Sequence, residues 1–375
     1  MSAPSPPCQH AEYLGRKYLP ELDGLRALSV LMVVTVHLHE HTWDWIAGNK
    51  GVTIFFILSG YLITFLALRE ESERGTLSLS AFYVRRTFRI FPSYYLVLAV
   101  YGFLILVVGV RSDKTTNFLT ALPYDLLYLQ EIPFEFGVNG MHDNLPFYHA
   151  WSLGIEEKFY LVWPVLAFLA LRSKKVLRLP IALALAAFFS VTAAVFGRTV
   201  GGCLFSYFHI LLGCAVALVL QGEPAYRYLS VLGQRKFAGL TTVSLLVVHF
   251  SWPHFGRWPY VDTVDVVYSI IASAFLVSVL TGRGLLQRIL SRPPLPLIGR
   301  LSYGIYLVHV LCLNAVEKAL VRLAHGHIGL SLSILKLVGA IITSVSVAYL
   351  LHRTVEKPLI EIGRRWSKRL HGQTS

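Results

Sequence analysis

Residues 19–41 read LPELDGLRALSVLMVVTVHLHEH, an apolar run that opens with charged residues and closes with histidines. Asp23 and Arg26 lie at its start, and His37 follows Arg26 by eleven residues. At about 100° and 1.5 Å per residue, eleven helical steps return to within roughly 20° of the same face, about 16 Å further along the axis. The stretch predicts a membrane helix with a cation at one end and an imidazole about halfway across the bilayer. Such a buried histidine is either a functional group or a hydrogen-bond partner of a neighbouring helix.

The composition is far too apolar for a soluble globular protein. The 375 residues are 55% hydrophobic and only 15% charged, and the mean hydropathy is +0.57. The net charge is +13, but the basic residues form short clusters between apolar runs, which excludes a nucleic-acid-binding protein. Because apolar runs of about 17–25 residues match the bilayer, we predict an all-α, polytopic membrane protein. About ten transmembrane helices are expected, near residues 26–45, 51–68, 90–110, 150–171, 179–197, 203–220, 237–252, 263–281, 300–321 and 331–352.

The distribution of Lys and Arg predicts the orientation of these helices. With an even number of spans and a cytoplasmic N-terminus, most of the 34 Lys and Arg residues fall in cytoplasmic segments, as the positive-inside rule requires. We therefore expect both termini to be cytoplasmic and the protein to reside in the inner, cytoplasmic membrane. The expected domains are a cytoplasmic tail (1–18), a transmembrane domain (19–358) and a basic cytoplasmic tail (359–375). The first twenty residues lack the apolar core of a signal peptide, so the first helix is expected to serve as the targeting signal.

Small residues and cysteines predict packing and not chemistry. Gly51, Ser59 and Gly60 lie in an apolar run, GVTIFFILSGYLITFL, where small side chains allow close helix packing or a local break in the helix. Ser59 as a nucleophile is the less favoured alternative, because no base lies beside it in the sequence. The four cysteines show no paired spacing, so neither a disulfide nor a metal site is expected.

A basic segment, RRTFRIFPSYYL, marks the start of the third predicted span. Arg86 and Arg89 are three residues apart and therefore neighbours on one helix face. They either anchor the helix at the inner surface or bind phosphate, because guanidinium groups contact phosphate oxygens bidentately. Together with Arg26 at a similar depth, they would suit a donor that carries a nucleotide, such as coenzyme A.

Two further segments place polar side chains inside predicted spans. In HAWSLGIEEKFYLVWP, residues 149–164, Glu156 and Glu157 are expected a turn or two below the outer surface. A carboxylate at this depth would orient the imidazole of His37 and stabilise its protonated form; alternatively, these acids pair with Lys158 or cap a helix.

The second of these segments is GRLSYGIYLVHVLCL, residues 299–313. Ser302, Tyr306 and His309 follow one another at steps of four and three, so they share one helical stripe. They either line the same cavity as His37 or form ordinary hydrogen bonds between helices.

Five blocks of this sequence, taken together, resemble one known family. LPELDGLRALSVLMVVTVHLH, GVTIFFILSGYLIT, RRTFRIFPSYYL, WSLGIEEKFYLVWP and LSYGIYLVH occur in the order found in the acyltransferase 3 family of membrane-bound O-acyltransferases. The similarity extends from about Tyr18 to Pro358. It implies a ten-helix core that moves an acyl group, most often acetyl, from cytoplasmic acyl-CoA to a hydroxyl of a glycan or glycosylated acceptor. Acyl-CoA, in most members acetyl-CoA, would be a donor substrate, with no tightly bound cofactor.

The resemblance also implies roles for individual residues. His37 matches the essential histidine, for which we expect a general-base role, and Arg26 matches the arginine of the same motif. Arg86 and Arg89 match the paired arginines that we assign to the donor phosphates, and Glu156 matches the acid of the SLxxE block. The remaining candidates, assigned to substrate binding, are Asp23, Ser302, Tyr306 and His309. Some members add an outer hydrolase-like domain; this chain stops short of one, so a single domain is expected to suffice.

Two other functions are compatible with the residues alone. A proton-coupled transporter of a sugar-like or anionic solute also needs His, Glu and Arg near the middle of the membrane. A non-catalytic membrane scaffold would tolerate substitution of His37.

Overall fold

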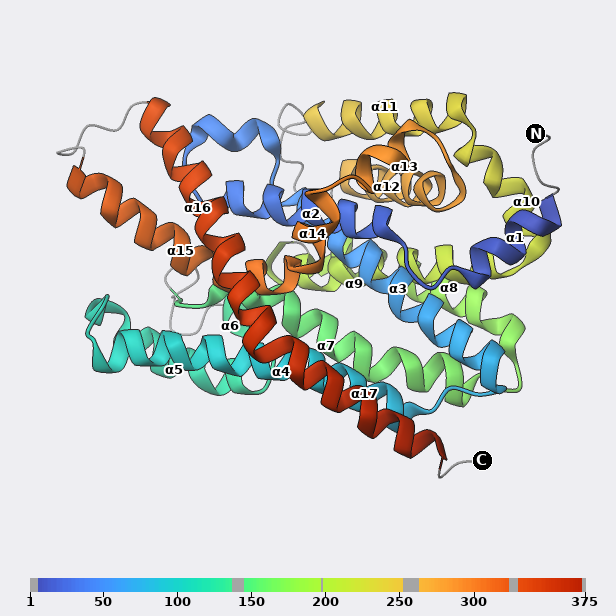
Figure 1. The fold of residues 1–375 in the computed structure, drawn as a ribbon, viewed down its shortest axis with the longest axis horizontal. Helices are drawn as coiled ribbons and strands as arrows, with labels where there is room; N and C mark the ends of the chain where they lie inside the picture. Colours follow the sequence, from blue (N-terminus) through green and yellow to red (C-terminus); the bar gives the residue numbers. More distant parts are fainter. Residues whose placement is uncertain (1–5, 137–144, 197, 252–262, 324–329, 373–375) are drawn as a thin grey trace. The chain divides into compact units, whose positions relative to one another are not determined.

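The computed structural model describes residues 6–136, 145–196, 198–251, 263–323 and 330–372, and in these residues every regular element is helical (Figure 1). The contacts divide the chain into two units. The first unit comprises residues 1–75 and 166–302, and the second comprises residues 76–165 and 303–375. Each unit is described by itself below.

Seven helical segments in the described residues are long and apolar enough to cross a membrane, and an eighth forms if a pair bent by 74° counts as one span. They are His41–Arg74, Leu79–Val107, Lys175–Phe196, Gly202–Gln221, Val264–Thr281, Ser302–Arg322 and Ser331–Leu370, with Glu223–Gly233 and Arg235–Ser251 as the bent pair. These eight coincide with eight of the ten predicted spans. The chain is therefore a multi-pass membrane protein.

The other two predicted spans correspond to shorter or more polar helices. The predicted span at 26–45 is not one helix: α2 (Pro20–Val36) has 17 residues, and the short helix η1 (His41–Ile46) follows it. The predicted span at 150–171 is α7 (Trp151–Pro164) followed by the π-helix η6 (Val165–Ala170), and it contains Glu156, Glu157 and Lys158.

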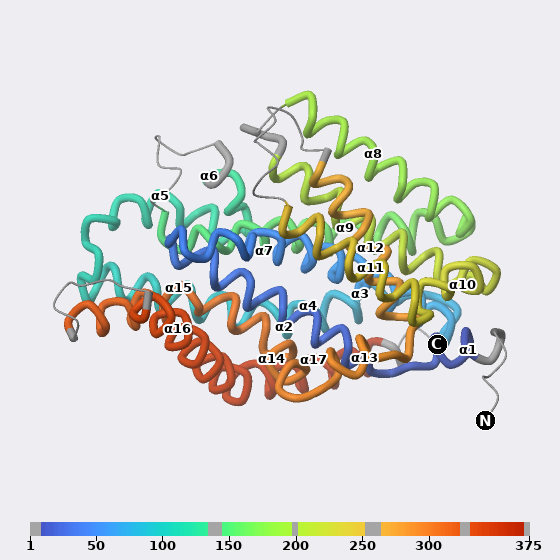
Figure 2. Tube along the Cα trace, turned by 90° about the horizontal axis from the view of Figure 1, so that it is seen from above, coloured from blue at the N-terminus to red at the C-terminus, as the bar shows by residue number. Residues whose placement is uncertain are grey.

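The first unit is built around α3, α8 and α9, which lie side by side (Figures 1 and 2). Glycines permit this packing: a Cβ on Gly60 would overlap the carbonyl group of Ile210, and one on Gly213 would overlap that of Ile57. The predicted close packing at Gly60 is thus confirmed. The unit contains α1 (Pro6–Gly15), α2, η1, α3 (Lys50–Arg74), η7 (Lys175–Leu177), α8 (Arg178–Phe196), α9 (Arg198–Gln221), α10 (Glu223–Leu229), η8 (Ser230–Gly233), α11 (Arg235–Ser251), α12 (Thr263–Thr281), α13 (Leu285–Leu290) and α14 (Leu295–Arg300).

Buried ion pairs hold both ends of α3. At its start, the ammonium group of Lys50 pairs with Asp265 of α12. Near its end, Arg178 of α8 donates two hydrogen bonds, of 2.6 and 2.8 Å, to the carboxylate of Glu71. Because burying an unpaired charge is costly, these pairs fix the alignment of α3 with α8 and α12.

The second unit contains α4 (Leu79–Gly102), η2 (Phe103–Val107), η3 (Ser112–Lys114), α5 (Thr115–Leu126), α6 (Glu131–Phe136), η5 (Tyr148–Ala150), α7, α15 (Ser302–Leu323), α16 (Leu330–Leu351), η10 (His352–Glu356) and α17 (Lys357–Gly372). The helix α16 continues through the π-helix η10 into α17 (Figure 1). The segment predicted as a basic tail from residue 359 is therefore helical as far as Gly372.

The C-terminal helix α17 packs antiparallel on α4. Ser93 donates to Glu356 at the end of η10 at 3.3 Å, and Arg85 donates to Ser367 of α17 at 2.7 Å, so residue numbers fall from α17 to η10 as they rise along α4. Between these contacts, Gly363 lies against the side chain of Phe88. These contacts hold α17 against the basic segment of α4.

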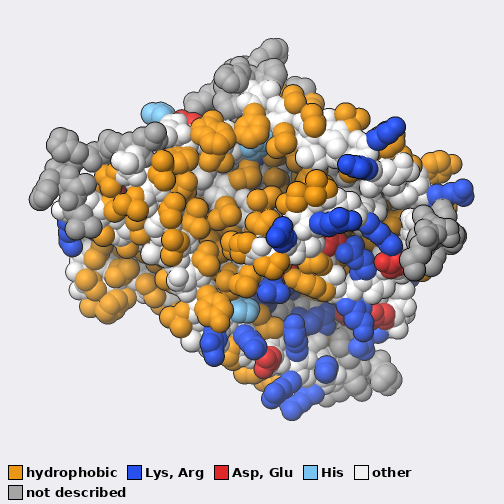
Figure 3. Space-filling view, turned by 45° about the horizontal axis from the view of Figure 1, so that its top comes forward, with side chains coloured by type: hydrophobic (Ala, Val, Ile, Leu, Met, Phe, Trp, Pro, Cys, Tyr) orange, Lys and Arg blue, Asp and Glu red, His pale blue; other side chains and the backbone are white. Residues whose placement is uncertain are grey.

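Large apolar side chains are exposed on the helices that would cross a membrane (Figure 3). On α8, Phe188 is 60% exposed and Val195 is 73% exposed. Soluble proteins rarely expose continuous apolar surface of this kind. The exposed faces are consistent with contact with lipid chains.

Candidate active-site residues

His37 lies at the end of α2, where its own side chain helps to stop the helix. Its Nδ1 atom lies 2.8 Å from the carbonyl oxygen of Val33, the group that the His37 amide would bond in a continuing helix, and the amide bonds Val34 instead. A carbonyl oxygen only accepts, so Nδ1 carries the proton and the neutral ring has its basic lone pair on Nε2. The structure thus assigns the tautomer that a base acting through Nε2 requires.

The loop after His37 folds back against the same end of α2. A Cβ on Gly48 would overlap the carbonyl oxygen of Met32, and one on Gly51 would overlap that of Ser29. Since side chains larger than hydrogen are excluded there, the backbone contacts α2 directly at Gly48, and at Gly51 in the first turn of α3. His37 itself is half-buried.

Asp23 and Arg26 lie near the start of α2, where two short helices pack against it. Gly24 faces the carbonyl group of Leu290 on α13, and Gly299 of α14 faces the backbone of Asp23, with no room for a Cβ at either position. Asp23 and Arg26 are half-buried, and their charged groups lie 4.0 Å apart. The glycine between them is thus required by packing.

The arginines of α4 are held on different sides of that helix. Arg85 contacts Ser367 of α17, whereas the guanidinium group of Arg86 lies over the ring of Tyr160 on α7, 4.6 Å from its centroid. Arg89 is exposed. The ring of Tyr160 attracts the guanidinium group of Arg86, because a cation is attracted to the face of a ring.

Glu156 lies in the same set of contacts. Its carboxylate accepts a hydrogen bond of 2.7 Å from the hydroxyl of Tyr160, the residue whose ring lies under Arg86. The predicted alternative, a pair with Lys158, is wrong: Lys158 pairs with Glu131 at 2.6 Å and donates to the carbonyl of Tyr128. The structure therefore brings Arg86 and Glu156 together through one tyrosine.

Tyr306 and His309 lie together on α15, as predicted, and contact η5 and α7. The hydroxyl of Tyr306 donates to the carbonyl of His149 and lies 2.7 Å from the hydroxyl of Ser152. The rings of His149 and His309 are 5.1 Å apart, and both residues are buried. Ser302 is also buried, and no described residue hydrogen-bonds its hydroxyl.

The candidates fall in both units. Asp23, Arg26, His37 and Ser302 belong to the first unit, and the other candidates, Arg86, Arg89, Glu156, Tyr306 and His309, belong to the second. No group of three or more His, Cys, Asp or Glu side chains among the described residues is arranged to hold a metal ion.

Comparison with known proteins identifies the family. The model of the acyltransferase-domain family, acyltransferase 3, matches residues 19–353, which include every candidate named above. The chain belongs to this family.

Relatives of this acyltransferase 3 chain carry the names of O-acetyltransferases. It is 31% identical over 316 residues to the peptidoglycan O-acetyltransferase OatA of Listeria monocytogenes, covering 78% of this chain and 49% of the relative. It is 30% identical over 385 residues to the putative peptidoglycan O-acetyltransferase YrhL of Bacillus subtilis, covering 94% and 57%. A putative O-acetyltransferase of Staphylococcus aureus is 29% identical over 335 residues, covering 82% and 52%. The chain thus spans about half the length of the curated relatives it matches, and no solved structure matches it.

Residues that sequence reasoning did not single out complete the contacts of this acyltransferase 3 chain. His149 and Ser152 contact Tyr306, and Tyr160 connects Arg86 with Glu156. A usable signal existed for Tyr160, because it lies four residues after Glu156 on one helix face. His149 and Ser152 contact a helix more than 150 residues away, which no local pattern indicates.

Proposed function

We propose that this chain is a membrane-embedded O-acyltransferase that moves an acyl group, in most reactions acetyl, from cytoplasmic acyl-CoA to a hydroxyl of a glycan or glycosylated acceptor. The family match over residues 19–353 and relatives named as peptidoglycan O-acetyltransferases support this proposal. They do not favour the transporter alternative.

The contact between His37 and Val33 carries the mechanistic part of the proposal. With the proton on Nδ1 bonded to a carbonyl oxygen, Nε2 is the basic atom of the neutral ring. We propose that Nε2 takes the proton of the acceptor hydroxyl as its oxygen attacks the thioester carbonyl. The carbon–sulfur bond then breaks, and the thiolate leaving group takes the proton from the imidazolium. General-base assistance of this kind contributes roughly 10²–10⁴-fold to the rate.

An acyl-enzyme route would divide the same proton transfers between two steps. In both routes, the guanidinium groups proposed to bind the donor's phosphates are those of Arg86 and Arg89, with Arg26 in the same role. Glu156 is proposed to be a catalytic carboxylate. Asp23, Ser302, Tyr306 and His309 are the proposed substrate-binding residues.

We further propose that α2 and the helical segment of α7 and η6 complete a set of ten spans with the eight described above. Under that proposal, both termini are cytoplasmic and the chain lies in the inner, cytoplasmic membrane. The short α2 fits this assignment, because a helix of 17 residues rises about 26 Å, close to the thickness of the hydrocarbon core.

The decisive experiment compares histidine variants of the full chain reconstituted in vesicles. Release of free CoA from acetyl-CoA by the vesicles, and base-labile acetate on the envelope glycans of cells that produce each variant, are the two readouts. We expect His37→Gln to lower transfer at least about 100-fold, whereas His41→Gln, whose side chain is exposed beside Asp44, should retain it. Normal membrane insertion with full transfer in His37→Gln would refute the assignment.

The arginine and carboxylate variants belong to the same assay. Arg86→Gln and Arg89→Gln should raise KM for acetyl-CoA more than KM for the acceptor, because phosphate contacts act on the donor alone. Glu156→Gln should lower kcat. Solute uptake by the vesicles without any acyl donor would instead support a transporter.

A further inference from the structure

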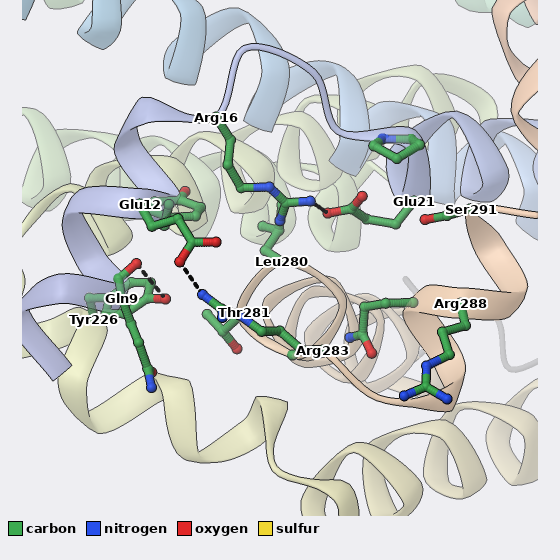
Figure 4. A pocket seen from close by; sticks show the side chains of 14 residues that line it. Gln9, Glu12, Arg16, Glu21, Tyr226, Leu280, Thr281, Arg283, Arg288 and Ser291 are labelled. Carbon is green, nitrogen blue, oxygen red and sulfur yellow. Dashed lines mark hydrogen bonds and ion pairs between the residues drawn. The ribbon is translucent and has the colours of Figure 1, made fainter. Parts of the chain in front are cut away.

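A pocket of about 360 Å³ lies within the first unit, where α1, the start of α2, α10 and the turn between α12 and α13 meet (Figure 4). Its volume is at the lower end of the range typical of small-molecule sites. None of the candidate active-site residues lines it. The pocket is therefore a separate feature that the proposed reaction does not use.

Three guanidinium groups and two carboxylates line this pocket. Arg16 points toward Glu21 and pairs with it at 2.6 Å, and Arg283 points toward Glu12 and pairs with it (Figure 4). Arg288 forms no ion pair with any residue that the structure describes. The lining thus carries one positive charge in excess.

The two ion pairs differ in how readily they can exchange partners. The Glu21 side chain is 2% exposed, so its pair with Arg16 is a fixed part of the pocket wall. The side chains of Arg283 and Glu12 are 58% and 54% exposed, and a pair so exposed contributes little to stability. An anionic ligand can therefore replace Glu12 as the partner of Arg283.

The turn that carries Arg283 and Arg288 is held in a fixed conformation. The side-chain nitrogen of Gln287, Nε2, donates to the backbone carbonyls of Ser278 and Val279 at 2.9 and 3.2 Å. Its side-chain oxygen, Oε1, accepts from the backbone N–H of Gly284 at 2.8 Å. Because the backbone is already ordered, binding an anion here costs little additional entropy.

The position of the pocket relative to the spans also points to a ligand class. Thr281, which lines the pocket, is the last residue of the span Val264–Thr281, and the pocket also includes Pro20, the first residue of α2. The pocket therefore lies where apolar helices end, at the level of the lipid headgroups. Basic pockets at this level suit phosphate groups.

We propose that this pocket binds a phosphate-bearing ligand through Arg283 and Arg288. Guanidinium groups contact phosphate oxygens bidentately, and the excess positive charge of the lining suits an anionic phosphate group. Two classes of ligand carry such a phosphate group: soluble nucleotides and anionic phospholipids. The proposal does not depend on acyl transfer, because binding is measured without an acyl donor.

The test uses the purified full chain in neutral detergent with two probes, adenosine 3′,5′-bisphosphate and phosphatidylglycerol. Binding is followed by the shift of the thermal unfolding midpoint with probe concentration. We expect the double variant Arg283→Gln, Arg288→Gln to bind the effective probe at least about tenfold more weakly, as expected for loss of charged hydrogen bonds. Arg292→Gln, an exposed arginine four residues from Arg288 that does not line the pocket, is the matched control and should bind as the unaltered chain does.

A second variant separates binding from a folding defect. Glu12→Gln removes the carboxylate that competes for Arg283, so it should tighten phosphate binding several-fold. A response to the nucleotide alone identifies a soluble ligand, and a response to phosphatidylglycerol alone identifies a lipid headgroup; both support the site. If neither probe binds, or if the double variant and Glu12→Gln bind like the unaltered chain, the proposal is overturned.

Discussion

The helix that carries His37 and the helix that carries Arg86 are held in different ways. In the first unit, α2 is packed against backbone: Gly24, Gly48, Gly51 and Gly299 bring main-chain atoms of other segments into direct contact with it or its neighbours. In the second unit, α4 is packed against side chains, including Tyr160, Ser367 and the ring of Tyr128, which stacks on Tyr94 at 4.2 Å.

The two kinds of packing differ in how much structural change they tolerate. A backbone contact has no rotamer with which to relieve a clash, so the position of α2 is rigidly determined. Side chains adjust by rotation, so the surroundings of α4 can adapt to different occupants of its basic segment. The contrast suits the proposed roles, a reactive group in the first unit and groups that bind the donor in the second.

The largest effect is expected for Gly299→Ala in the first unit. The added methyl group would overlap the carbonyl group of Asp23, and α14 would have to move away from α2. Overpacking against backbone should cost about 3 kcal/mol of unfolding free energy, measured by thermal unfolding in detergent. Transfer activity should fall with it, because α2 is displaced.

Gly239→Ala on α11 is the control for that substitution. Nothing lies within 4 Å of a Cβ at this position, so the alanine should stabilise the helix by about 0.5–1 kcal/mol. Equal stability of both variants would show that the backbone contact at Gly299 does not limit substitution in the first unit.

An intermediate effect is expected for Tyr306→Phe in the second unit. The change removes a buried hydroxyl that bonds the carbonyl of His149 and contacts Ser152, leaving both without that partner. The expected loss is about 1–2 kcal/mol in the unfolding free energy. Tyr95→Phe removes a more exposed hydroxyl bond to Leu126 and should cost less; a larger loss there would contradict the assignment.

The smallest effect is expected for Gly304→Ala, which places a methyl group 3.2 Å from the side chain of Ala348 on α16. A few tenths of an ångström of adjustment relieve this contact, and the gain in helix propensity offsets part of the cost. The unfolding free energy should change by less than about 1 kcal/mol. If this variant unfolded like Gly299→Ala, the second unit would be as rigid as the first.

Much of the fold follows from the length of apolar runs. Eight of the ten predicted spans coincide with long apolar helices. Such a span can be predicted from the local sequence alone, because the length of the apolar run matches the thickness of the bilayer. The end of α2 at Val36 could not be predicted in this way. At that end the imidazole of His37 bonds the Val33 carbonyl, which is a side-chain contact and not a feature of hydropathy.

The candidate residues were predictable where they share one helix. The stripe that joins Tyr306 and His309 follows from helical spacing, and the structure confirms that they lie together. Their contacts with His149 and Ser152 depend on the packing of distant segments. The phosphate-site residues Arg283 and Arg288 likewise come together with α1 only in three dimensions.

The continuous helix of α16, η10 and α17 exceeds any bilayer. The 40 residues from Ser331 to Leu370 rise about 60 Å, roughly twice the depth of the hydrocarbon layer. About half of this helix must lie outside the hydrocarbon layer, and the charged half is the one that lies antiparallel to the basic turns of α4. Arg85, bonded to that half, is thus lifted clear of the lipid chains, where a multiply charged, water-soluble molecule can reach it without entering hydrocarbon.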